Sequence, residues 1–121
     1  MVRFFVEGGW AMWPVLIFGM VTIGSAIRFV QRPETAQLKF VAAIGLTTLM
    51  FTIHATWMNL GSTFRSLEDP ERVPDAELVR TIFAGLKEST RAGTLGLHLL
   101  AAACLLVAIG FLRAKQKTAA A

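Results

Sequence analysis

The sequence predicts an all-α integral membrane protein, a single membrane domain over residues 1–121 with three transmembrane helices. Of its residues, 55% are hydrophobic and 17% are charged, and the mean hydropathy is +0.58. That composition is too apolar for a small soluble domain, which must cover its core with polar surface. Three runs of 20, 25 and 21 residues lack Asp, Glu, Lys and Arg; they are residues 8–27, 40–64 and 92–112. Because about 20 apolar residues at ~1.5 Å per residue cross the ~30 Å hydrocarbon layer, each run fits one crossing.

The first helix is expected at about residues 9–31. Trp10 and Trp13 stand at its start, where indole rings favour the headgroup region, and Arg28 stands near its other end. We predict these three side chains as membrane-interface anchors. A cleaved export signal is the alternative, and it is disfavoured because only Arg3 carries positive charge ahead of the run.

The second helix is expected at about residues 39–64 and carries a polar face. The spacing of i, i+4, i+8 and i+11 puts four polar side chains within about 80° of one another; they are Thr48, Thr52, Thr56 and Asn59. His54 falls on a different face of this helix.

The third helix is expected at about residues 92–113, after an amphipathic helix at about residues 75–91. The amphipathic segment repeats apolar residues every four positions, and it either lies on the membrane surface or runs on into the third helix. Thr94 and His98 lie one turn apart on one face of the third helix. Counted from the ends of the spans, His54 and His98 are expected at equal depth, ~8–9 Å below one membrane surface.

Three interpretations of the polar groups inside the spans remain open. They hold the helices together by interhelical hydrogen bonds, which small residues such as glycine assist by close approach. Alternatively, they line a path for water and protons, since histidine titrates near neutral pH and threonine hydroxyls relay protons. In the third interpretation, His54 and His98 ligate a haem or a metal ion in a membrane anchor.

The distribution of basic residues predicts the orientation of the chain. The first connection holds three basic residues and one acid, and the C-terminal tail holds three basic residues and no acid, whereas the second connection is mixed. The positive-inside rule therefore puts the first connection and the C-terminus in the cytoplasm and the N-terminus outside. The net charge of +4 reports this topology, and we find no basic and aromatic surface for nucleic acid.

The sequence offers little for catalysis. The one cysteine, Cys104, lies in the middle of the third run and is expected as a small buried residue. Patterns for nucleotide, dinucleotide or zinc binding are lacking. We therefore expect neither an enzyme nor a bound cofactor.

Three segments resemble the MotA/TolQ/ExbB proton-channel family. The stretch GGWAMWPVLIFGMVTIGSAIRFVQR is similar to its first transmembrane helix, and ATWMNLG followed by Phe64 and Leu67 resembles its second-helix pattern GTVxGxxxAFxxL. GLKE through TLGL resembles its third-helix opening GxxEALxxTAxGL. The family's second-helix threonine maps onto Thr56, and its third-helix threonine maps onto Gly93. The large cytoplasmic domain that family members carry between the first two helices is missing here.

The resemblance implies a homo-oligomeric ring, a pentamer in this family, in the bacterial inner membrane. Such a ring surrounds a single-span partner resembling ExbD, TolR or MotB, contacts membrane lipid, and couples the proton gradient to work on the cell envelope. The resemblance implies that the second and third helices line the central space, which assigns the lining to Thr48, Thr52, Thr56, Asn59, Thr94 and His98. His54, Gly19 and Gly93 are expected in subunit packing. A non-conducting scaffold ring is the alternative, favoured by the missing cytoplasmic domain and by glycine at the third-helix threonine position.

Overall fold

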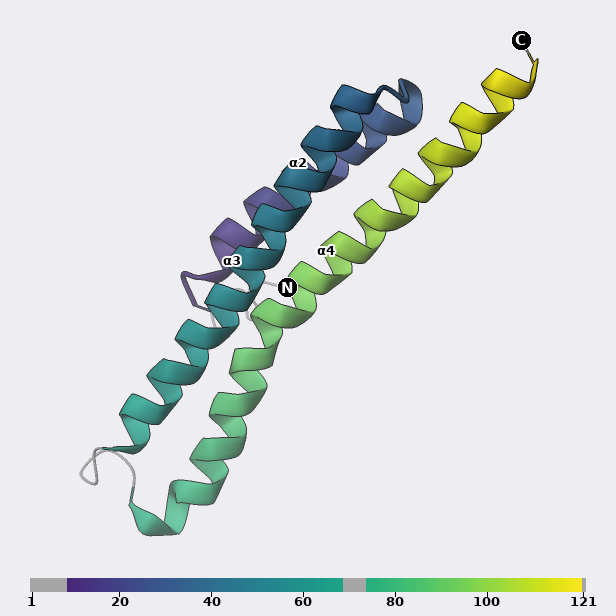
Figure 1. Cartoon of the computed structure of the whole chain (residues 1–121). Coiled ribbons are helices and arrows are strands. Elements are labelled where there is room, and N and C mark those ends of the chain that lie inside the picture. Colours follow the sequence, from purple (N-terminus) through teal and green to yellow (C-terminus); the bar gives the residue numbers. More distant parts are fainter. Residues whose placement is uncertain (1–8, 69–73, 121) are drawn as a thin grey trace.

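The computed structural model describes residues 9–68 and 74–120, which form an antiparallel bundle of long helices (Figure 1). The helices are α2 (Met12–Gln31), α3 (Thr35–Leu67) and α4 (Leu78–Ala120), and the short 3-10 turn η1 (Asp75–Glu77) precedes α4. All three long helices have the length and apolar composition to cross a membrane. The predicted all-α fold with three potential membrane spans is confirmed.

Local chemistry explains where α2 begins and ends. Gly9 has a φ of +71°, a left-handed conformation that glycine adopts without steric cost, and its carbonyl accepts a hydrogen bond from the Met12 amide. At the other end, Pro33 disfavours a helical conformation for the residue before it. Arg32 accordingly has extended backbone, with φ of −133° and ψ of 90°. The chain thus reverses within a few residues and enters α3 at Thr35.

The helices differ in length, and α4 decides between the two alternatives for residues 75–91, which run on into the third helix. At ~1.5 Å per residue, the 20 residues of α2 span about 30 Å, whereas the 33 residues of α3 and the 43 of α4 span about 50 and 65 Å. Residues 75–91 form no separate amphipathic helix, because all but η1 belong to the continuous α4. Extra turns of α3 lie beside this part of α4, with Thr63 against Gly85, so its inner face packs on protein.

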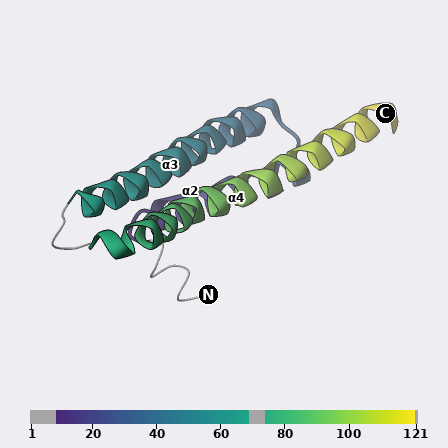
Figure 2. The same cartoon turned by 90° about the horizontal axis from the view of Figure 1, so that it is seen from below.

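The two ends of the bundle carry different charges. We name the end at which α3 stops and α4 starts the hairpin end, and the opposite end, where the chain turns from α2 into α3, the basic end. The basic end holds the positively charged side chains around the α2–α3 turn and in the last turns of α4: Arg28, Arg32, Lys39, Arg113, Lys115 and Lys117. Figure 2 shows that α4 continues past the α2–α3 turn at this end.

The core consists of two apolar clusters separated by buried hydroxyls. Met12, Val15, Ala55 and Ala92 form the cluster toward the hairpin end, and Ala26, Phe29, Val41 and Ala103 form the cluster toward the basic end. Between them, the Thr22 and Thr48 hydroxyls are 2.8 Å apart and fully or almost fully buried. All three helices contribute to the core, so α2 covers one side of the α3–α4 pair.

Candidate functional site

The threonine stripe of α3 faces a row of glycines on α4. A Cβ added at Gly96 would meet Thr52, a Cβ at Gly85 would meet Thr63, and a Cβ at Gly93 would lie 3.2 Å from the Thr56 Oγ1. Each glycine therefore receives a threonine side chain and lets the two backbones approach closely. This row of contacts, named here the threonine–glycine seam, sets the antiparallel register of α3 and α4.

The hydroxyls of the seam have their hydrogen bonds inside the subunit. Thr48, Thr52 and Thr56 each donate to the carbonyl oxygen four residues earlier, at 2.9, 2.7 and 2.9 Å. Thr48 is 0% exposed and Thr52 is 3% exposed. Within one subunit, these two side chains therefore do not line an open space, because Thr52 packs against Gly96 of α4 and Thr48 lies against Thr22 of α2. The sequence analysis assigned both side chains to the lining of a central space, whereas in the subunit both pack between the helices.

Asn59 lies further along the same face of α3, near the hairpin end. It is half-buried and borders a cavity of about 410 Å³ whose lining includes the polar residues Ser62, Thr63, Thr81 and Glu88. This cavity lies where α3 and α4 run past the start of α2. Asn59 therefore borders a space with polar side chains, whereas Thr48 and Thr52 are buried in the bundle.

Thr94 and His98 occupy the opposite side of α4 from the seam. Both are exposed, and His98 is two residues from Gly96, or ~200° around the helix, so it points away from α3. The His98 Nδ1 is 2.7 Å from the Thr94 carbonyl oxygen. A carbonyl only accepts, so this contact requires the proton on Nδ1 and leaves Nε2 for a group outside the subunit.

The two histidines do not meet in one subunit, and their depths differ. Thr52 lies opposite Gly96, so the antiparallel register places His54 level with Thr94. His98 then lies four residues, about 6 Å, deeper in the bundle than His54, not at the equal depth expected from counting along the spans. Both are exposed, and each points away from the seam, so a shared haem or metal ion would need two subunits. Among the described residues there is no group of three or more metal-ligating side chains.

The remaining predicted residues divide between internal packing and the surface. Gly19 is buried against Leu99 of α4, and a Cβ added at Gly93 would lie 3.2 Å from the Thr56 Oγ1, so both glycines contact other helices of the same subunit. Trp10 and Trp13, predicted as membrane-interface anchors, are 79% and 54% exposed. Arg28 is also exposed, in the last turn of α2.

Sequence reasoning missed the partner of the threonine stripe and the position of Cys104. The spacing of small residues along α4 indicates the face that packs on the other helices. The buried small residues recur at intervals of three, four or seven: Gly85, Ser89, Ala92, Gly96, Ala103 and Gly110. Cys104 is exposed rather than buried. It borders an apolar groove between α3 and α4 that no local pattern in the sequence indicates.

Comparison of the chain with protein-family models, with curated proteins and with solved structures found no match. A functional assignment therefore depends on the geometry of the helices and on the sequence resemblance.

Proposed function

We propose that this protein is the ring subunit of an inner-membrane complex similar to TolQ, ExbB and MotA, which couples the proton gradient to work on the cell envelope. The observation that carries the proposal is the exposed pair of Thr94 and His98 within the apolar part of α4. His98 lies seven residues, about 10 Å, from Arg91, the last charged residue before the run. An imidazole facing lipid at that depth is costly, so it needs water or a neighbouring subunit.

A ring provides that environment. When the outward face of α4 lines a central space, Thr94 and the Nε2 of His98 meet water and the single-span partner. The imidazole of His98 has a nitrogen that can accept and release a proton, which a residue on a proton path needs. Because the threonine–glycine seam is internal, and Asn59 lies on the same inner face of α3, the lining in this proposal is Thr94 and His98. The scaffold alternative shares the ring and differs only in lacking proton transfer at His98.

The ring is tested by the mass of the assembly. We expect native mass spectrometry of the full chain, released from vesicles in a mild detergent, to show a closed oligomer of the 13.2 kDa subunit, with five copies. A single-span partner expressed with the chain should add its mass to that oligomer. Monomers alone, under conditions in which the helical circular dichroism signal is intact, would refute the ring.

The proposed orientation has the hairpin end outside the cell and the basic end in the cytoplasm. In a Cys104→Ala background, a cysteine at Ala76 should react with a membrane-impermeant thiol reagent in intact cells. A cysteine at Ala119 should react only after the cells are permeabilised. Both positions are exposed in the subunit, so access depends on the side of the membrane. The reverse labelling pattern would contradict both the orientation and the family resemblance.

A further inference from the structure

An apolar groove lies between α3 and α4, near the basic end. It has a volume of about 480 Å³, and the side chains and backbone along it are almost entirely apolar and small or aliphatic. Residues from both helices form its walls, among them Leu38, Ala42, Gly45, Leu49, Leu100 and Cys104, and Thr22 of α2 contributes to its lining. Small side chains at Ala42 and Gly45 leave the space that larger residues would fill.

The length and polarity of this groove match one acyl chain of a phospholipid. From Leu38 to Leu49 the helix rises by eleven residues, about 16 Å, which is half of the ~30 Å hydrocarbon layer. The Thr22 hydroxyl donates to the Phe18 carbonyl oxygen at 2.7 Å and lies 2.8 Å from the Thr48 hydroxyl. The polar group in the lining is therefore satisfied within the bundle, and the groove favours an apolar occupant.

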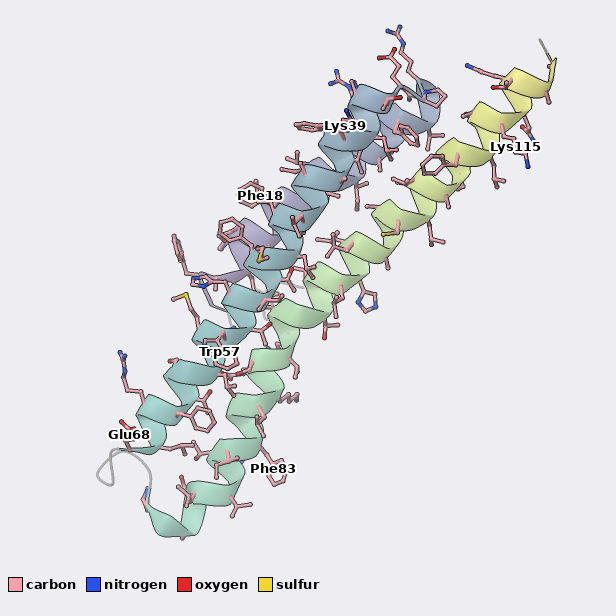
Figure 3. The ribbon with its side chains drawn as sticks, viewed as in Figure 1. Phe18, Lys39, Trp57, Glu68, Phe83 and Lys115 are labelled. Atoms are coloured by element: carbon pink, nitrogen blue, oxygen red, sulfur yellow. The ribbon has the colours of Figure 1, made fainter. Side chains whose placement is uncertain are left out.

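Two lysines lie where such a lipid would place its headgroup. Lys39 shares a face of α3 with Ala42 and Leu46, at i, i+3 and i+7, and Lys115 lies three turns beyond Cys104 on the same face of α4. Figure 3 labels both lysines, which extend from different helices at the basic end. Both are exposed, and the sequence has no acid from residue 35 to 67 or from residue 89 onward. The end of the groove therefore favours a negatively charged headgroup.

We propose that this groove binds one anionic phospholipid per subunit. One acyl chain lies between α3 and α4, and the phosphate lies at the basic end, where Lys39 and Lys115 supply positive charge. The binding is independent of proton transfer and of the ring, because a single subunit provides every residue that it uses.

The test is native mass spectrometry of the full chain titrated with phosphatidylglycerol and with phosphatidylcholine of identical acyl chains. We expect the first phosphatidylglycerol to bind on the order of 10-fold more tightly than phosphatidylcholine, since two lysines act on the anionic headgroup. Lys39→Gln combined with Lys115→Gln should lower the affinity for phosphatidylglycerol to that for phosphatidylcholine. Lys117→Gln is the matched control, because it removes a nearby charge from another face of α4, and it should leave the preference unchanged.

A second variant tests the groove itself. Cys104→Trp places a large ring in the groove from an exposed position, so it should weaken both lipids while the circular dichroism spectrum stays helical. Unchanged phosphatidylglycerol binding in Cys104→Trp would overturn the proposal. A loss of phosphatidylglycerol preference in Lys117→Gln equal to that in the double lysine variant would also overturn it.

A second copy of the chain is the rival occupant of the groove, and oxidation of the wild-type protein in vesicles tests for it. Efficient Cys104–Cys104 disulfides between copies would show that a second subunit covers the groove and would also refute lipid binding there.

Discussion

Gly96→Ala is expected to destabilise the bundle by about 1–3 kcal/mol, the usual cost of overpacking a close contact. The new Cβ would overlap the side chain of Thr52, whose own Cβ would be 2.8 Å away. Thr52 has little freedom to move, because it is buried, β-branched and hydrogen-bonded to the Thr48 carbonyl oxygen. The backbones of α3 and α4 must therefore separate. The measurement is the midpoint of thermal unfolding in detergent, followed by tryptophan fluorescence.

Two other glycines provide the matched controls. A Cβ at Gly24 or at Gly61 meets nothing within 4 Å, so alanine at either position should leave the subunit as stable or raise its stability by up to about 1 kcal/mol through helix propensity. Adding Thr52→Gly to Gly96→Ala should recover part of the loss, since it removes the atoms that clash. If Gly96→Ala behaved like the two controls, the threonine–glycine seam would not hold α3 against α4.

His98→Ala is expected to abolish proton flux in vesicles that contain the ring and its single-span partner, while the mass of the oligomer stays unchanged. His98 is exposed and hydrogen-bonded to the Thr94 carbonyl oxygen of its own helix, so its removal leaves the internal packing intact. The imidazole is the titratable group in this part of the span, and alanine has no site for a proton. His98→Gln keeps a hydrogen-bonding side chain without the titration and should also fail to conduct.

His54→Ala is the matched control for this experiment. It also removes an exposed imidazole from a span, but His54 lies on the far side of α3, beside Met50 and Phe51, about 6 Å nearer the hairpin end. We expect it to keep proton flux and to weaken the oligomer by about 0.6 kcal/mol for each interhelical hydrogen bond lost. Full flux in both His98 variants would remove this residue from the mechanism and favour the scaffold ring.

The sequence by itself determined the fold class and the number of potential membrane spans. Charge-free runs of at least 20 residues favour membrane-spanning helices, because a helix satisfies its own backbone hydrogen bonds in lipid. The approximate bounds of the first helix, residues 9–31, were also predicted, and its ends at Gly9 and Pro33 depend on local backbone preferences. The positions of Trp10 and Trp13 at the start of the first helix and of the basic side chains at its other end also follow from the sequence alone.

Only the tertiary structure decided what each face of a helix contacts. Helical spacing showed that Thr48, Thr52 and Thr56 share a face, but a central space and a row of glycines on α4 are equally compatible with that spacing. The register between Thr52 and Gly96 selected the glycines, separated His54 from His98 in depth, and left the groove beside Cys104 open. These features depend on contacts between residues on different helices, 22 to 44 positions apart in the threonine–glycine seam, which periodicity within a single helix does not encode.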